Sequence, residues 1–288
     1  MNRKDFIKNS ILGGVAAVTI SHQGLGSKEE IKSPKDEVGF NHIPNTDSNI
    51  MKNVVLHKAD TRGFADHGWL KARHTFSFAN YYNPERVQFG VLRVLNDDII
   101  AGGMGFGTHP HDNMEIITIP IEGELKHSDS MGHEEVIRQG EIQVMSAGTG
   151  VKHSEFNNLK DRHINLLQIW MLPNKRNVAP RYDQQVLDFS KMQNNWLQVL
   201  SPNMDDDGVW VHQNAWFHLG EFKKESKISY KIKNSKNGLY IFMISGNAQV
   251  NGIELNTRDG LGAWEIENFD FQITGEKTKI LLMDVPMS

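Results

Sequence analysis

Short apolar or alternating segments recur from about residue 52 to the C-terminus, each separated from the next by turn-forming residues. Examples are residues 87–95, 115–121, 141–145, 164–172 and 239–245. Such segments are typical of strands, and their number is typical of a β-sandwich or barrel. Asn251-Gly252 is also a strong signal for a two-residue hairpin. Helical periodicity is scarce, and residues 179–194 are expected to hold one short helix or an irregular crossover. The sequence therefore predicts an all-β fold.

A weak internal repeat indicates that the chain contains two domains of one type. In the first half, Gly123 precedes Gly140 by 17 positions, and in the second half Gly246 precedes Gly260 by 14 positions. The order of strand, turn and strand around these glycines is the same in both halves. We therefore expect two tandem β-barrels, over residues 52–185 and 186–288.

The composition restricts the chemistry that the chain can carry. It has no cysteine and 13 histidines, so disulfides, thiolate metal sites and cysteine nucleophiles are excluded. A transition metal must then be held by histidines and carboxylates. The net charge of −4 makes nucleic acid a poor candidate partner. No apolar run reaches the roughly 18 residues that a membrane-spanning helix needs, and we expect no membrane span.

Residues 1–23 are expected to form an export signal. Arg3, Lys4 and Lys8 precede a mostly apolar stretch that is too short for a transmembrane helix. Lys4 stands where a twin-arginine signal has its second arginine, so the segment is twin-arginine-like. A periplasmic or exported protein is the expectation, with a cytoplasmic protein that carries an apolar tail as the alternative. Residues 24–51 are polar and rich in turn formers, which predicts a flexible linker.

Histidines and carboxylates gather in two stretches of the first predicted barrel. His109, His111 and Glu115 are separated by even numbers of residues, and so are His153 and Glu155. Because residues two apart on a strand share a face, each set would project to one side. If both strands line one barrel, these side chains converge into a site for Fe, Mn, Ni, Cu or Zn. The spacing does not choose between Glu115 and Glu155 as the carboxylate.

The segments that carry these residues resemble the two cupin motifs. Gly107-x-His109-x-His111-x3-Glu115, with Gly123 beyond, is similar to the first motif, and Gly140-Glu141-Ile142, Gly148 and His153-x3-Asn157 are similar to the second. More narrowly, the chain resembles the pirin family and its quercetin 2,3-dioxygenase-like bacterial members. The supporting stretches are Gly68-Trp69-Leu70 and residues 74–82, 108–111, 129–132, 145–150, 153–157 and 167–170.

The resemblance implies a bicupin, in which two double-stranded β-helix (jelly-roll) barrels follow one another. It also implies one mononuclear metal in the N-terminal barrel, with His109, His111, His153 and Glu155 as ligands. Glu115 then becomes a carboxylate that supports the ligands without binding the metal, or the alternative ligand. Fe(II) is the metal expected, with Mn, Ni, Cu or Zn as alternatives. The C-terminal barrel is expected to be free of metal.

The activity implied by the resemblance is O₂-dependent cleavage of a flavonol such as quercetin, or of another enol or phenol. Glu155 would serve there as both ligand and general base. A non-catalytic, metal-binding regulatory or interaction protein of the pirin type is the alternative from a different class. Isomerisation or hydrolysis of another small molecule at the same site is a third possibility, because cupins host many chemistries.

Several other polar and aromatic residues of the first barrel are assigned structural roles. Residues 76–82 include an aromatic run, which we expect to pack in the core or between the lobes. His74 is expected to be a hydrogen-bond partner within the structure. His127 and His133 are expected to lie in a solvated hairpin around Gly132.

Overall fold

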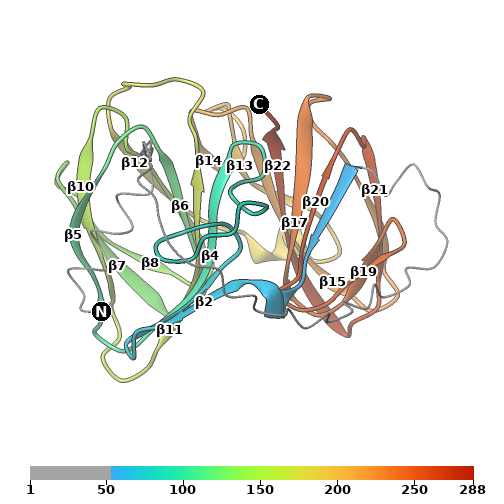
Figure 1. The fold of residues 1–288 in the computed structure, drawn as a ribbon, viewed down its shortest axis with the longest axis horizontal. Helices are drawn as coiled ribbons and strands as arrows, with labels where there is room; N and C mark the ends of the chain where they lie inside the picture. The colour runs from blue at the N-terminus through green and yellow to red at the C-terminus, as the bar shows by residue number, and fades with distance from the viewer. Residues whose placement is uncertain (1–52) are drawn as a thin grey trace, which may run out of the picture.

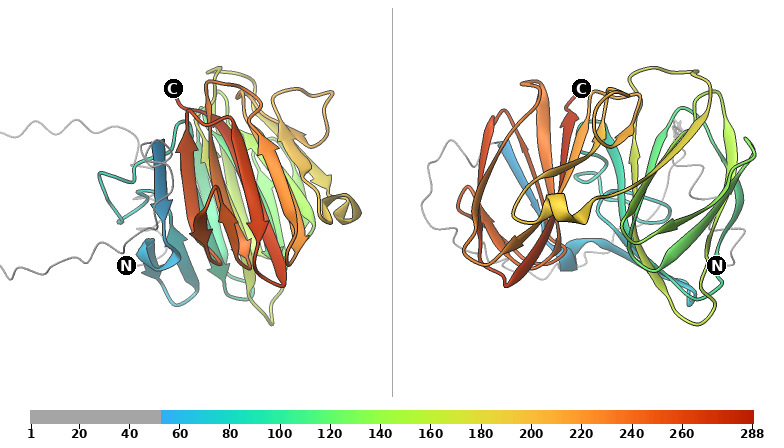
Figure 2. Two further views of the ribbon diagram at one scale, coloured as in Figure 1. Left: turned by 90° about the vertical axis from the view of Figure 1, so that its right-hand side faces the viewer. Right: turned by 180° about the vertical axis from the view of Figure 1, so that it is seen from behind.

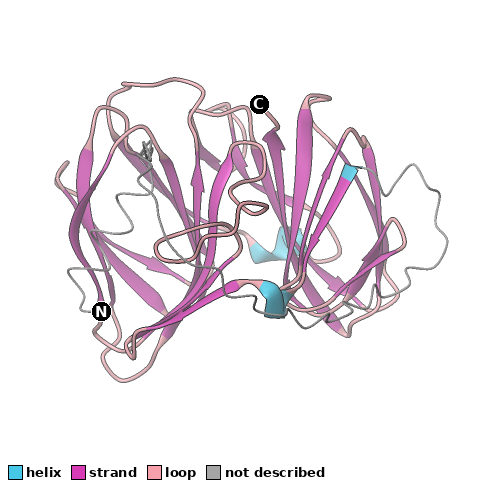
Figure 3. Cartoon of the chain, viewed as in Figure 1, coloured by secondary structure: helices cyan, strands magenta, loops and turns pink. Residues whose placement is uncertain are grey.

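The computed structural model describes residues 53–288, and the expected export signal (1–23) and linker (24–51) lie outside these residues. The described chain consists almost entirely of strands, which confirms the all-β prediction (Figure 3). Its helices are two short 3-10 turns, η2 (Ala59–Thr61) and η3 (Phe189–Met192). Between residues 53 and 288, no helix has the length and apolar character needed to cross a bilayer.

The first lobe consists of a seven-stranded and a four-stranded sheet that face each other (Figure 1). The larger sheet has the order β12 (Arg181–Val186), β9 (Glu141–Ser146), β6 (Glu115–Glu122), β11 (Ile164–Met171), β4 (Leu92–Ile100), β3 (Leu70–His74) and β2 (Gly63–Asp66). The smaller sheet has the order β5 (Gly105–His111), β10 (Val151–Asn157), β7 (Glu124–Asp129) and β8 (Glu134–Arg138).

The second lobe repeats this arrangement, as the weak sequence repeat predicts. Its larger sheet has the order β1 (Val54–His57), β20 (Gly260–Trp264), β17 (Asn237–Ser245), β22 (Lys277–Pro286), β15 (Trp216–Lys223), β13 (Leu197–Ser201) and β14 (Val209–Trp210). Its smaller sheet has the order β16 (Lys227–Lys231), β21 (Asn268–Ile273), β18 (Ala248–Val250) and β19 (Ile253–Leu255). The predicted Asn251-Gly252 hairpin joins β18 and β19, and both residues have the positive φ of a primed turn.

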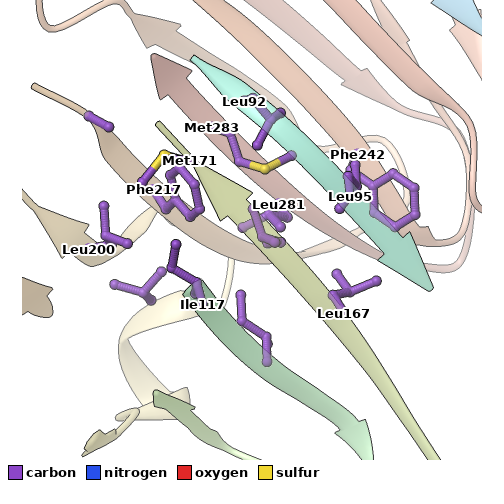
Figure 4. Close-up of a cluster of buried hydrophobic side chains, with 14 of the residues drawn as sticks. Leu92, Leu95, Ile117, Leu167, Met171, Leu200, Phe217, Phe242, Leu281 and Met283 are labelled. Carbon is purple, nitrogen blue, oxygen red and sulfur yellow. The ribbon is translucent and has the colours of Figure 1, made fainter. Parts of the chain in front are cut away.

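The two lobes share one hydrophobic core between their seven-stranded sheets (Figures 2 and 4). Side chains of the first lobe, such as Ile117 and Leu167, pack there with Phe217, Phe242 and Leu281 of the second. Because a strand alternates its faces, the intervening residues of the same strands point into the interior of their own lobe. The second interior is filled mainly by apolar side chains, with a small polar cluster around Asp284, whereas the first holds the histidines and Glu155.

The chain crosses between the lobes at both ends of the first sheet. β1 adds to the edge of the second lobe by pairing with β20, although its residues fall within the expected first domain, 52–185. At the other end, β12 pairs with β9 as far as Val186, and η3 follows. The segment 179–194 is therefore a strand and a 3-10 turn.

Buried charges also join the lobes. Arg258 of the second lobe lies 3.2 Å from the carboxylate of Asp97 on β4, and Arg62 lies 3.3 Å from the same carboxylate. Asn165 donates a hydrogen bond to Asp97 and accepts one from Arg258. Removing one partner from such a network leaves a buried charge uncompensated, so the network favours a single relative placement of the lobes.

Candidate metal centre

Two antiparallel strands of the smaller sheet bring the three predicted histidines together. β5 carries His109 and His111, and β10 carries His153, which lies directly opposite His109 in the strand register. The ring centroids of His109 and His153 are 4.4 Å apart, and those of the other two pairs are 4.9 Å apart. One ligand nitrogen from each ring lies within 4.8 Å of the others. Within residues 53–288, no other group of three metal-ligating side chains meets so closely.

The hydrogen bonding of the histidines leaves nitrogen atoms available for a cation. Both ring nitrogens of His153 and Nε2 of His111 are buried and have no hydrogen-bond partner in the described part of the chain. His109 donates its Nδ1–H to the carbonyl of Gly107 at 2.8 Å, which leaves its Nε2 lone pair free. A buried polar atom without a partner costs about 1–3 kcal/mol. A coordinated cation would remove that cost, so these residues fit a transition metal.

The histidines are held in their neutral form. Burial lowers the pKa of His111 to about 3, with a smaller contribution from His109. Burial also lowers the pKa of His153 well below its ordinary value, and that of His109 in the same direction. A neutral imidazole is the form that binds a metal, and it needs no proton release near neutral pH.

Glu155 is buried on β10 and is held by a glutamine. The register between β10 and β5 shifts by a bulge between His153 and Glu155, which re-aims the side chains on either side of it. Both carboxylate oxygens accept hydrogen bonds from Nε2 of Gln168, at 2.9 and 3.1 Å. Burial raises the pKa of Glu155 to about 7, against the opposing effect of Gln168. Its carboxylate is outside the group of nitrogens that lie within 4.8 Å of one another, and its role as fourth ligand stays a prediction.

The structure does not bring Glu115 to the histidines. β5 ends at His111 and β6 begins at Glu115, with Asn113 at a φ of 45° between them, so the alternation of faces does not carry across. Glu115 instead shares a face of β6 with Ile117, toward the core between the lobes. Its carboxylate accepts a hydrogen bond from Oγ of Ser146 at 2.7 Å. Burial raises the pKa of Glu115 to about 7, although this bond and one from the backbone of His212 oppose that shift.

The expectation that His127 is solvated is wrong. His127 lies on β7 and is fully buried, with its ring centroid 5.4 Å from that of His153. Its Nε2 lies 3.1 Å from the carboxylate of Asp129, which His133 also contacts at 3.0 Å. Both imidazoles pack against the ring of Tyr182. The even spacing of Leu125, His127 and Asp129 in the sequence is the signal that indicates this inward face.

The aromatic run contributes to the core and to one wall of the site. Phe76 packs in the core between the lobes, as expected, and His74 lies 2.9 Å from the side-chain oxygen of Asn96, the structural role expected of it. Phe78 packs edge-on against Trp170 at 5.4 Å, and Trp170 packs edge-on against His111 at 4.8 Å. The indole N–H of Trp170 is buried and has no partner among residues 53–288.

In the second lobe, the positions that correspond to metal ligands hold other residue types. Ile232 and Ile273, which are equivalent to His109 and His153 in the repeat, are buried. Ile273 packs in the apolar interior of that lobe. A buried polar cluster lies nearby, in which Asp284 accepts hydrogen bonds from the hydroxyl of Tyr230 at 3.0 Å and from Asn237 at 2.7 Å. These bonds satisfy the carboxylate without a cation.

The sequence and the fold are similar to those of known proteins. The family model Pirin matches residues 55–171, and the model of the quercetinase C-terminal cupin domain matches residues 198–285. A quercetin 2,3-dioxygenase of Escherichia coli strain K12 is 42% identical over 233 residues, which is 81% of this chain and 99% of that protein. A pirin-like protein of Caulobacter vibrioides is 38% identical over 70% of this chain and 87% of its own length.

A solved structure with a similar fold contains a bound metal. The crystal structure of a bacterial pirin from Escherichia coli in complex with nickel(II) superimposes with a TM-score of 0.77 at 40% identity. The match covers 82% of this chain and all of that one. The two-cupin architecture predicted from the sequence is confirmed, and the identity holds over nearly the whole of these relatives. The chain therefore belongs to the pirin family, among its quercetin 2,3-dioxygenase-like bicupins.

Proposed function

We propose that the chain is a dioxygenase that binds one Fe(II) ion through His109, His111, His153 and Glu155 and opens the ring of a flavonol such as quercetin with O₂. The observation that carries this proposal is the meeting of three neutral imidazoles inside one lobe, His153 buried and His109 and His111 half-buried, with unpaired nitrogens on His111 and His153. The name of the 42% identical relative supports the reaction, and the nickel complex of a homologue supports the presence of a divalent metal.

The charge of the proposed ligand set suits an acidic hydroxyl substrate. Three neutral imidazoles and one carboxylate leave a net charge of about +1 on a divalent ion's complex, so an enolate or phenolate binds more favourably than the neutral hydroxyl. When bound, such an ion supplies Lewis acidity and redox activity toward O₂. Nickel and iron are both accepted by imidazole and carboxylate donors, and we propose iron because it carries dioxygen chemistry.

Glu155 is suited to take the proton of the substrate hydroxyl. In the metal-free chain, burial raises the pKa of Glu155 to about 7, so this carboxylate is a stronger base than an exposed one. The amide nitrogen of Gln168 donates hydrogen bonds to both oxygens of Glu155, and it does not accept the substrate proton itself. We therefore assign the carboxylate of Glu155 as the proton acceptor in this step.

The surroundings of His111 suit an aromatic guest. Trp170 and Phe78 form an aromatic wall beside this ring, and Met114 and Met131, like Trp170, pack against one cluster of buried apolar side chains. Methionine and aromatic side chains adapt to flat rings, and the unpaired indole N–H supplies a donor for a substrate oxygen. Together these residues favour a planar substrate that carries oxygen atoms, as a flavonol does.

The test is turnover of quercetin by protein loaded anaerobically with Fe(II). Admission of O₂ is expected to remove the flavonol absorbance and release carbon monoxide, and a His153→Ala variant should do neither. Loading with Mn, Ni or Cu in parallel establishes which metal supports the reaction. Metal binding without oxygen-dependent loss of the flavonol, with every metal, would overturn the proposed activity and favour a regulatory role.

A further inference from the structure

The side chain of Gln168 lies in the interior of the first lobe, in contact with Glu155. It lies on β11, where its chain neighbours Leu167 and Ile169 pack in the core between the lobes, so its own side chain faces the lobe interior. Both Gln168 and Glu155 are buried, at 8% and 4% exposure. The amide nitrogen of Gln168 donates to both oxygens of the Glu155 carboxylate, at 2.9 and 3.1 Å.

Thr118 holds the oxygen end of the Gln168 amide. Thr118 is fully buried on β6 and lies directly opposite Gln168 in the strand register. Its hydroxyl donates to the amide oxygen of Gln168 at 3.1 Å. A flipped amide would turn its oxygen toward the Glu155 carboxylate, where two acceptors repel each other, so the carboxylate selects the orientation in which Thr118 donates to the amide oxygen. The hydrogen bonds that link the Thr118 hydroxyl, the Gln168 amide and the Glu155 carboxylate therefore have one favourable arrangement.

We propose that Gln168 is a positioning residue for Glu155, and that the hydrogen bond from Thr118 anchors the amide of Gln168 in place. The chain Thr118–Gln168–Glu155 restrains the carboxylate so that it is ready for the metal held by the histidines. This inference deepens the proposed function, and it depends on the part of that proposal which makes Glu155 a ligand. Partners that orient ligands in this way typically contribute 10–100-fold to metal affinity.

The experiment measures Ni(II) affinity of the full chain by competition with a chelator. Gln168→Met keeps the shape of the side chain and removes the amide, and we expect it to weaken Ni(II) binding by about 10–100-fold. Thr118→Val removes the hydroxyl and should weaken binding by about 10-fold, whereas Thr118→Ser keeps it and should stay within about 3-fold of the wild type. If Gln168→Met does not fold, the contrast between the two Thr118 variants decides the question.

The half-buried Gln184 offers a control for the loss of a hydrogen-bonded amide. Gln184 accepts a hydrogen bond from the hydroxyl of Tyr182 at 2.6 Å and donates to the carboxylate of Glu141 at 2.8 Å. This is the same sequence of groups, ending on a carboxylate that is not a proposed ligand. Gln184→Met should therefore leave Ni(II) affinity within about 3-fold of the wild type, while costing a similar number of hydrogen bonds.

A double-mutant cycle separates positioning from a general effect on the fold. If Gln168 acts through Glu155, adding Gln168→Met to a Glu155→Ala variant should change Ni(II) affinity no further. Additive losses, or equal affinities for Gln168→Met and the wild type, would overturn the inference. Because nickel binding requires neither O₂ nor quercetin, a failure of flavonol turnover alone would reject the proposed activity and leave the positioning role intact.

Discussion

Glu115→Gln tests where the structure places the second candidate carboxylate. Glu115 is 1% exposed and faces the core between the lobes, and its pKa in the folded chain is about 7 against an ordinary value of 4.5. The folded chain therefore keeps a proton on this group over a range of pH in which the unfolded chain has released it. Since the folded state binds more protons there, its stability falls as the pH rises from about 4.5 to about 7.

The size of this effect follows from the difference between the two pKa values. Each unit is worth about 1.4 kcal/mol, so the shift of Glu115 corresponds to roughly 3 kcal/mol of stability that is present at low pH and lost above pH 7. Glutamine has a similar shape and does not titrate. Glu115→Gln should thus be close to the wild type in stability near pH 4.5 and more stable by up to about 3 kcal/mol at pH 8.

The assay is urea unfolding of both proteins between pH 4.5 and pH 8, in the presence of a chelator. Other buried acids, including Glu155, titrate in both proteins, so they cancel from the difference. A difference in unfolding free energy that stays constant with pH, or that grows in favour of the wild type, would refute the reasoning. Ni(II) affinity of Glu115→Gln should remain within about 3-fold of the wild type, because the side chain lies on the face of β6 away from the histidines.

Two further pairs of substitutions test the shared core and the spacing of the ligand strands. Phe217→Ala, between the two large sheets, should lower the stability by about 3–5 kcal/mol, with both lobes unfolding in one calorimetric transition. Val186→Ala, on the surface, should change the stability by less than about 0.5 kcal/mol. Separate transitions would show that the lobes do not share a core. Gly105→Ala should weaken Ni(II) binding because its Cβ would collide with the carbonyl oxygen of Glu155 on the paired strand. Gly107→Ala, whose Cβ meets nothing within 4 Å, should bind as the wild type does, and equal affinities for the two variants would contradict this reason.

Much of the fold was accessible from the sequence because local patterns determine it. Alternating segments, the Asn251-Gly252 turn and the repeat around Gly123 and Gly246 report on strands and hairpins directly. The pairing of β1 with β20 joins residues more than two hundred positions apart. Nothing in the residues 54–57 distinguishes an edge strand of the first lobe from one of the second, because either sheet would accept the same pleated, half-buried segment.

The histidines and the two carboxylates show where sequence reasoning about the site ends. His109 and His111 lie on one uninterrupted strand, so their shared face follows from their spacing. Glu115 does not, because the turn at Asn113 resets the alternation before β6 begins. The placement of Gln168 and His127 around Glu155 and His153 depends on how β11 and β7 pack against β10, which is a property of the sheets and not of any short motif.

The most direct measurement is the titration of metal-free protein with Ni(II), followed by X-ray absorption spectroscopy of the bound ion. The account predicts one ion per chain, coordinated by at least three imidazoles, and loss of that site in a His153→Ala variant. Binding of one ion with unchanged affinity after His153 is replaced, or a spectrum without imidazole scattering, would show that the three histidines do not hold the metal.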